Sequence, residues 1–234
     1  MKKQLSLAVI VTALNEEKNI VPCVVKLQAF LEKAVNSYQI IVVDDGSTDN
    51  TWAALAPFQH SENIITLKLE KNGGVGASIK RALAHVETEW FCWFPSDLEF
   101  LPQELLSPIK ECDDTDIVTT YAGNALKVRS LFRYLLSKTF NTMMNQSFGL
   151  NLKYFNGITL YKKKAVEGLT IHSNRFFFHA ELLVKCLKKG CSFKQVPLVL
   201  SPRNSGKSNA IKWPVFLDVA TCYLKTFHEM TFKR

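Results

Sequence analysis

The sequence predicts an α/β fold with a mostly parallel central sheet flanked by helices. Its apolar runs are nearly continuous over strand length, as in parallel strands that are buried on both faces. Helix-like segments separate these runs, which is the alternation of a parallel sheet. The expected strands are Leu5–Val11, Gln39–Val43, Ile64–Leu69, Trp90–Phe94 and Asp116–Thr120. The helices expected between them are Glu17–Ala34, Asn50–Phe58, Val75–His85 and Pro102–Lys110.

The second half of the chain predicts more helix than strand. Its expected helices are Leu126–Phe148, Ala180–Lys189 (closed by Gly190) and Trp213–Phe232, with strand or extended chain at Ile158–Tyr161 and Ser192–Pro202 and a polar loop at Arg203–Asn209. We expect residues 1–209 to form one domain and 210–234 an amphipathic C-terminal helix. Apolar side chains recur there at helical spacing: Trp213, Phe216, Leu217, Ala220, Leu224 and Phe227. Such a helix either lies on an anionic membrane surface or docks on the domain.

Composition excludes several classes of protein. In 234 residues, 47% are hydrophobic and 21% are charged, which excludes a disordered chain, a collagen-like rod and a small disulfide scaffold. The net charge of +8 favours anionic partners, although solubility alone also explains it. The six scattered cysteines include no C-x-x-C pair and indicate free thiols in a reducing compartment. No run approaches the ~20 apolar residues that span a bilayer, so we expect a cytoplasmic protein.

Polar segments follow the predicted strands at their carboxyl ends, where parallel sheets bind ligands. Val42–Asp49 places two adjacent carboxylates after a buried strand, where they can accept hydrogen bonds from a base or ribose. Asp49 or Asn50 is expected to cap the next helix. Thr12–Glu17 ends the first strand in the same way, and taken alone it predicts a helix start capped by Asn15.

Three further segments suggest contacts with phosphate or metal. Asn72–Gly76 could bring backbone N–H groups near a phosphate, but it lacks the third glycine of a dinucleotide fingerprint, so a tight turn is favoured. Asp97 and Glu99 lie two residues apart and can chelate Mg²⁺ or Mn²⁺, unless Glu99 only caps the next helix. The loop Ser201–Ser208 carries cations suited to phosphate oxygens, with a solvated basic loop as the alternative. The five histidines have no metal-ligand spacing, so packing or surface roles are expected.

Together, these segments resemble the family 2 glycosyltransferases, which have the Rossmann-like GT-A fold of nucleotide-diphospho-sugar transferases. Among them the chain is most similar to the polyprenyl-phosphate (dolichyl-phosphate) mannose or glucose synthases. The resemblance extends from about Leu5 to Ser208 and rests on Thr12–Glu16, Val43–Asp49, Asn72–Ala77, Pro95–Glu99, Asn156–Lys162, Glu181, Val196–Pro197 and Arg203–Ser208.

The resemblance also implies roles for particular residues. Base and ribose contacts are implied for Thr12, Leu14, Glu16, Val43 and Asp45. Diphosphate contacts are implied for Ser96 and Asp97, a divalent metal (Mg²⁺ or Mn²⁺) for Asp97 and Glu99, and phosphate contacts for Arg203 and Lys207. The expected catalytic residues are Asp97, Arg203 and Lys207. The chain departs from the family pattern at Pro95, which replaces an Asp, at Thr12, which replaces a Pro, and after Asp116, where an Arg is absent and Lys127 or Arg129 could supply the charge.

The expected activity is inverting transfer of a hexose from a GDP-mannose or UDP-glucose type donor to a polyprenyl or dolichyl phosphate. Relatives that transfer to hydroxyl groups use an E-D pair, which the segment around Glu181 lacks. A lipid phosphate is already an anion and needs cations more than a base. The alternatives are a hydroxyl acceptor in glycan or cell-envelope synthesis, with Glu181 or another carboxylate as base, and a degenerate nucleotide-sugar-binding module. The cytoplasmic face of a membrane and a separate membrane subunit are further candidate partners; nucleic acid is not, because no recognition motif accompanies the charge.

Overall fold

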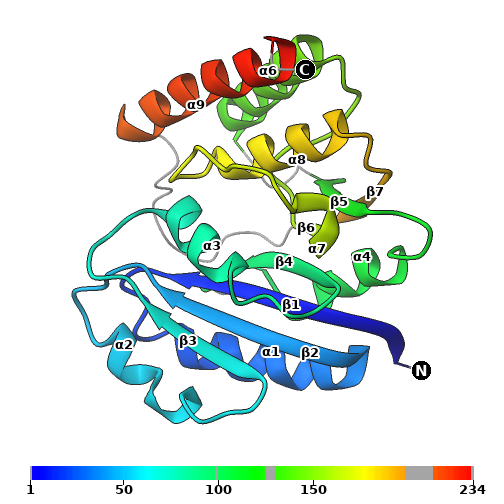
Figure 1. Ribbon diagram of the computed structural model, residues 1–234. Helices are drawn as coiled ribbons and strands as arrows, with labels where there is room; N and C mark the ends of the chain where they lie inside the picture. Colours follow the sequence, from blue (N-terminus) through cyan, green and yellow to red (C-terminus); the bar gives the residue numbers. More distant parts are fainter. Residues whose placement is uncertain (1, 98–99, 125–129, 199–212, 233–234) are drawn as a thin grey trace.

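The computed structural model describes residues 2–97, 100–124, 130–198 and 213–232 (Figure 1). Within them the strands form one seven-stranded sheet in the order β3-β2-β1-β4-β6-β5-β7. The strands are β1 Lys3–Ala13, β2 Val35–Asp44, β3 Ile64–Lys68, β4 Trp90–Pro95, β5 Ile117–Ala122, β6 Thr159–Lys162 and β7 Phe193–Leu198. All neighbouring pairs are parallel except those of β6, which runs antiparallel to β4 and β5. The predicted fold class is confirmed.

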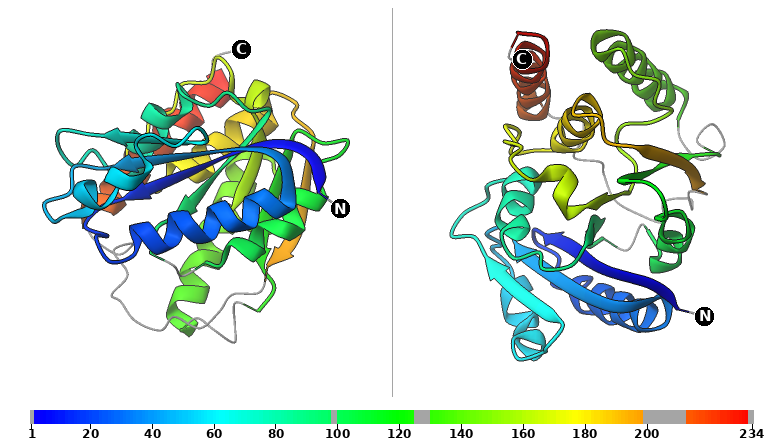
Figure 2. Two further views of the ribbon diagram at one scale, coloured as in Figure 1. Left: turned by 90° about the horizontal axis from the view of Figure 1, so that it is seen from below. Right: turned by 45° about the vertical axis from the view of Figure 1, so that its right-hand side comes forward.

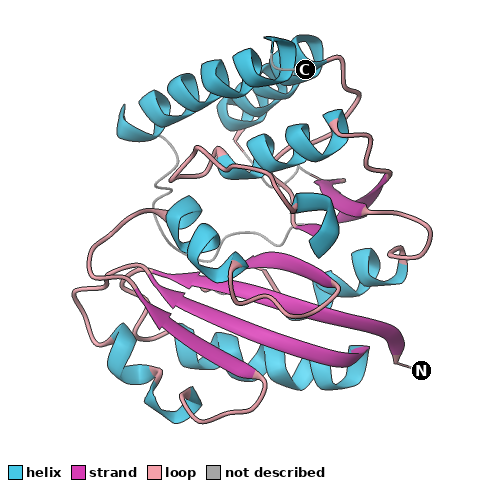
Figure 3. Ribbon diagram, in the orientation of Figure 1, coloured by secondary structure: helices cyan, strands magenta, loops and turns pink. Residues whose placement is uncertain are grey.

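Helices cover both faces of the sheet (Figure 3). They are α1 Ile20–Ala34, α2 Thr51–Ala54, α3 Val75–Leu83, α4 Leu106–Lys110, α6 Leu131–Phe148, α7 Lys163–Val166, α8 Phe178–Lys188 and α9 Trp213–Phe232, with 3₁₀ turns at Ala56–Phe58 and Pro102–Leu105. Leu7 and Val9 of β1 pack into the core on the α1 side, whereas Ala8 and Ile10 pack on the side of α3 and α8. Because both faces of β1 are buried, its sequence is continuously apolar rather than alternating.

Two predicted helices begin or break differently in the structure. The helix predicted from Glu17 begins at Ile20, because the N–H groups of Asn19 and Ile20 both donate to the Glu16 carbonyl in a preceding turn. Asn15 has a left-handed φ of 57° and is not the helix cap, so that prediction is wrong. The helix predicted at Asn50–Phe58 breaks after Ala54, since Pro57 has no N–H to donate to a helical carbonyl.

The C-terminal helix has the predicted bounds, and one side of it packs on the domain. Tyr223 and Phe227 each contact the ring of Phe148 at 5.9 Å between centroids, and the Tyr223 hydroxyl lies 2.7 Å from Ser147 Oγ. Figure 2 shows α9 beside α6, both lying beyond α8 as seen from the sheet. In the part of the chain that the structure describes, no helix is both long and apolar enough to cross a membrane.

The single-turn helix α7 was not predicted. Helix α6 begins at Leu131 and not at the predicted Leu126, because Ser130 before it has an extended backbone with φ −60° and ψ 147°. Residues 125–129 lie outside the described part of the chain. Strand β7 confirms the first half of the extended segment that was predicted at Ser192–Pro202. Residues 199–212 are not among the residues that the structure describes. Gly190 has a φ of +89° just after α8, as the prediction of a glycine at this helix end requires.

Candidate functional site

The loops that follow β1 and β2 are joined by hydrogen bonds. The Asn15 N–H donates to Ser47 Oγ at 3.0 Å, and the Thr48 N–H donates to Asn15 Oδ1 at 2.9 Å. The Asn50 N–H donates to the Glu17 carboxylate at 3.1 Å. The left-handed backbone of Asn15 turns its amide toward the second loop. The structure therefore brings the two polar segments predicted from the sequence to the same edge of the sheet.

Asp45 is bound to the glycine turn before α3. Its Oδ1 accepts the N–H of Gly73 and its Oδ2 accepts the N–H of Gly74, both at 2.9 Å. The side chain is only 4% exposed, and this burial raises the pKa of the Asp45 carboxyl although the hydrogen bonds oppose the shift. The N–H groups of Gly73 and Gly74 therefore bind Asp45. This agrees with the prediction that the glycine segment is a tight turn between strand and helix.

Thr12 links β1 to β4 at their carboxyl ends. The Trp93 indole N–H donates to Thr12 Oγ1 and the Ser96 hydroxyl donates to the Thr12 carbonyl, each at 2.9 Å. The two strands are parallel neighbours with Thr12 opposite Pro95. Because the Thr12 hydroxyl accepts the indole proton, it retains its own proton to donate to a ligand.

Two carboxylates lie near the buried thiol of Cys23 on α1. The pKa of this thiol is raised to about 12, chiefly by burial and in addition by the negative charges of Asp97 and Glu16. Asn19 Nδ2 donates to Glu16 Oε2 at 2.7 Å. The structure therefore places Asp97, from the end of β4, and Glu16, from the end of β1, in one neighbourhood.

The chemistry of Asp97 suits a divalent cation. Mg²⁺ is usually held by one or two protein carboxylates together with substrate phosphates, and Asp97 is a carboxylate of the kind that could serve in this way. Among the residues described, no three His, Cys, Asp or Glu side chains converge as a metal centre, and Glu99, the second predicted ligand, is not among them.

The other predicted residues occupy different positions. Leu14 is 39% exposed at the end of β1, whereas Val43 is fully buried in the core, so only its backbone could contact a ligand. Neither Arg203 nor Lys207 lies in the described residues, and the same holds for Lys127 and Arg129.

Glu181 is fully buried and fully engaged. Its Oε1 accepts the His172 N–H at 2.8 Å and its Oε2 accepts the Ser173 N–H at 2.9 Å. Lys185 Nζ lies 2.9 Å from Glu181 Oε1, and both side chains are inaccessible to solvent. Lys185 also pairs with Glu229 of α9 at 2.8 Å. Because this carboxylate is fully buried and both its oxygens already accept hydrogen bonds from the protein, a substrate does not reach it, and its contacts are those of a structural group.

His179 was not distinguished from the other histidines by sequence reasoning. It is 7% exposed, and its ring lies 4.9 Å from that of Trp93 and 3.9 Å from that of Phe178, measured between centroids. Burial lowers its pKa to about 3, so the imidazole is neutral near pH 7. Since Trp93 bonds Thr12, His179 lies one side chain away from the candidate site. The phenylalanines that precede it in the sequence are a signal of its burial.

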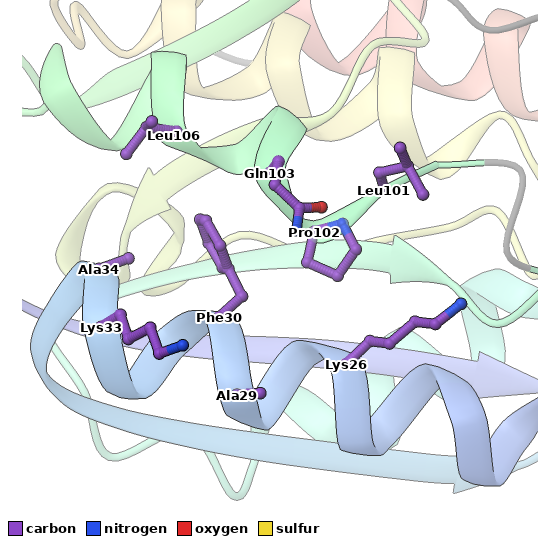
Figure 4. Close-up of a pocket in the computed structure, with 9 residues that line it drawn as sticks. All are labelled: Lys26, Ala29, Phe30, Lys33, Ala34, Leu101, Pro102, Gln103 and Leu106. Carbon is purple, nitrogen blue, oxygen red and sulfur yellow. The ribbon is translucent and has the colours of Figure 1, made fainter.

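A groove of about 550 Å³ lies between α1 and the segment Leu101–Leu106 (Figure 4). Phe30 and Leu106 line it, with Lys26 and Lys33 of α1 beside them. None of the described site residues predicted from the sequence is part of its lining. The groove therefore does not mark the site at the carboxyl ends of the strands.

The fold brings the polar segments that follow β1, β2 and β4 together at one edge of a mostly parallel sheet. Residues 8–170 match the model of glycosyl transferase family 2, so the chain belongs to this family. The predicted family is thereby confirmed, and the chain is a glycosyltransferase of this class.

Solved structures of glucosyl-3-phosphoglycerate synthase from Mycobacterium tuberculosis share the fold. The complex with UDP has a TM-score of 0.72 and 17% identity, covering 95% of this chain and 80% of that chain. The complex with Mg²⁺ and UDP has a TM-score of 0.71 and 16% identity, covering 95% and 79%. The complex with Mn²⁺, UDP and phosphoglyceric acid has a TM-score of 0.70 and 18% identity, covering 95% and 78%. This likeness establishes the GT-A architecture.

Proposed function

We propose that this protein transfers a hexose from a nucleotide sugar to a polyprenyl phosphate. The observation that carries the proposal is the engagement of Glu181, whose oxygens bind two backbone N–H groups and Lys185. This makes Glu181 unavailable as the base that a hydroxyl acceptor would require. A phosphate acceptor is already ionised and needs no such base, so its oxygen can attack the sugar directly.

The donor would bind across the carboxyl ends of β1, β2 and β4. In this proposal Thr12, Leu14, Glu16 and Asp45 contact the base and ribose, together with the backbone of Val43. Ser96 and Asp97 face the diphosphate, and Arg203 and Lys207 bind phosphate oxygens. Structural neighbours hold UDP or UDP-glucose, which supports UDP-glucose as the first donor to test.

The chemistry would be a single displacement that inverts the anomeric centre. Negative charge develops on the departing diphosphate, and cationic groups near it lower the barrier. Asp97 and Glu99 would hold Mg²⁺ or Mn²⁺, which when bound supplies this stabilisation. The catalytic residues in this proposal are Asp97, Arg203 and Lys207.

Exposed apolar side chains support an acceptor at a membrane surface. Four of them lie in the first turns of α6, namely Leu131 (67% exposed), Phe132 (68%), Leu135 (51%) and Leu136 (50%). Arg133 and Lys138 belong to the same helix and would favour anionic lipid. We propose residues 1–209 as the catalytic domain and 210–234 as a helix that docks on it while exposing Leu217 and Leu224.

The test is an isotope-labelled sugar-transfer assay with purified protein. UDP-glucose or GDP-mannose would be incubated with a polyprenyl phosphate, with and without Mn²⁺ or Mg²⁺, and label in the lipid phase would be counted. We expect lipid-phase label in the wild type, its loss in Asp97→Asn, and its retention in the exposed control Asp114→Asn. Full transfer by Asp97→Asn would refute the role of that carboxylate.

A hydroxyl acceptor is the second candidate, because a structural neighbour was crystallised with phosphoglyceric acid. A parallel reaction with 3-phosphoglycerate separates the two. Label in the aqueous product and none in lipid would replace the polyprenyl phosphate by a small anionic acceptor. Donor binding without either product would indicate a binding module.

A further inference from the structure

The segment from Ile171 to Phe176, which leads into α8, is held rigidly against α3. The Asn174 carbonyl accepts the N–H groups of Gly76 at 2.9 Å and Ala77 at 3.4 Å, and Lys80 Nζ donates to the Asn174 side chain. A Cβ on Gly76 would lie 2.5 Å from the Ser173 carbonyl, so the two backbones approach as closely as glycine allows. The start of α3 therefore fixes one side of this segment.

The opposite side of the segment is fixed by α8 and α9. The Glu181 carboxylate binds the N–H groups of His172 and Ser173, and the Ser173 hydroxyl donates to Asp218 of α9 at 2.7 Å. Ser173 Oγ also accepts the N–H of Arg175 at 3.1 Å. The backbone is thus fixed up to Arg175. Fixing an exposed loop costs conformational entropy, and this cost favours a role in positioning the side chains of Arg175 and Phe176.

The segment also bridges the candidate site. Asn174 touches the glycine turn that binds Asp45, since a Cβ on Gly74 would lie 2.3 Å from the Asn174 carbonyl oxygen. Five residues later, His179 contacts Trp93, which donates to Thr12. The chain therefore passes from the turn after β3 to the end of β4, across the strand ends that we assign to the donor.

Arg175 lies in the middle of this bridge. It is exposed, and its guanidinium makes no hydrogen bond or ion pair with any residue that the structure describes. Its stem runs beside the glycine turn, because a Cβ on Gly74 would be 3.4 Å from Arg175 Cγ. The adjacent Phe176 is 42% exposed. A rigid backbone thus holds a free cation and an apolar ring at the edge of a site that also contains Asp97 and Glu16.

We infer that Arg175 binds a phosphate group of the bound substrate, either the diphosphate of the donor or the phosphate of the acceptor. A guanidinium offers paired N–H donors that match phosphate oxygens. In a site with several carboxylates, a fixed cation also offsets repulsion of an anionic substrate. Phe176 beside it suits a substrate that joins a phosphate to an apolar chain. The inference rests on the proposed function, to which it adds a residue that the sequence did not indicate.

The test compares Arg175→Gln and Arg175→Lys with the matched control Arg81→Gln, an exposed arginine on α3. Calorimetry would give the Kd of UDP and GDP without acceptor, and the transfer assay would give the KM of the polyprenyl phosphate. Loss of a charge-assisted hydrogen bond should weaken one of these constants by about 10- to 100-fold in Arg175→Gln. Arg175→Lys should recover part of the loss, and Arg81→Gln should match the wild type.

The two constants identify the source of the phosphate. A weaker Kd for the nucleotides assigns Arg175 to the donor diphosphate, whereas an unchanged Kd with a raised KM assigns it to the acceptor. If both constants of Arg175→Gln match those of Arg81→Gln, the inference fails while the transferase proposal stands. A wild-type protein that neither binds nucleotide nor transfers sugar would overturn both.

Discussion

The burial of His179 predicts a pH dependence of stability that one substitution should remove. The folded imidazole has a pKa of about 3, against 6.5 for an ordinary histidine, because burial disfavours its charged form. Between these values the unfolded chain binds a proton that the folded chain does not. The contribution to stability is therefore fully present above pH 6.5 and is lost as the pH falls toward 3.

The size of the effect follows from the two pKa values. At pH 5 the unfolded histidine is almost fully protonated and the folded one is almost fully neutral. Linkage then gives a loss of about 2 kcal/mol in the free energy of unfolding between pH 8 and pH 5. Because Trp93 and Phe178 surround the ring, His179→Phe should keep the aromatic contacts and remove the titration.

Urea denaturation at pH 8 and pH 5 measures this difference. The wild type should lose about 2 kcal/mol more than His179→Phe over that interval, since other groups titrate equally in both. His60→Gln is the control for replacing an exposed histidine. Equal losses in the wild type and His179→Phe would refute the burial argument.

Three substitutions test the contacts that shape the site, each by urea denaturation. Lys185→Met should destabilise the fold by about 3–5 kcal/mol, because it leaves the buried Glu181 carboxylate without its cation. Gly157→Ala should cost about 1–3 kcal/mol, since its Cβ would lie 1.9 Å from the Thr120 carbonyl oxygen. Asp45→Asn should cost about 1–3 kcal/mol, because an amide NH₂ would face a backbone N–H that the carboxylate now accepts.

The same residue changes at positions without these contacts serve as controls for Lys185→Met and Gly157→Ala. Lys194→Met breaks an exposed ion pair with Glu111 and should cost less than about 1 kcal/mol. Gly123→Ala has no atom closer than 3.8 Å to its Cβ and should be tolerated. If Lys185→Met is no more destabilising than Lys194→Met, the buried pair does not hold the segment before α8. If Gly157→Ala and Gly123→Ala are equally stable, the close approach to Thr120 is relieved at little cost.

The fold class and the places of the polar segments along the chain could be predicted from the sequence. The apolar runs of β1 and β2 are continuous because helices cover both faces, and this pattern is local enough to be recognised without a structure. The same holds for α9, whose bounds follow from its periodicity. Periodicity alone did not predict the break near Pro57. The apolar pattern favoured one helix from Asn50 to Phe58, but Pro57 has no N–H to donate, and the structure has two short helices there.

Which polar groups are already engaged within the protein becomes apparent only from contacts between distant parts of the chain. Asp45 and the glycine turn are distant in sequence, yet each Asp45 oxygen accepts one N–H of the turn and keeps one lone pair for the proposed ribose contact. Glu181 binds Lys185 and two backbone N–H groups, whereas the guanidinium of Arg175, six residues earlier, makes no hydrogen bond or ion pair with any described residue. Residue type states what a side chain can bind. Whether it is already bound depends on neighbours that the topology of the sheet brings together, and a linear pattern does not contain that information.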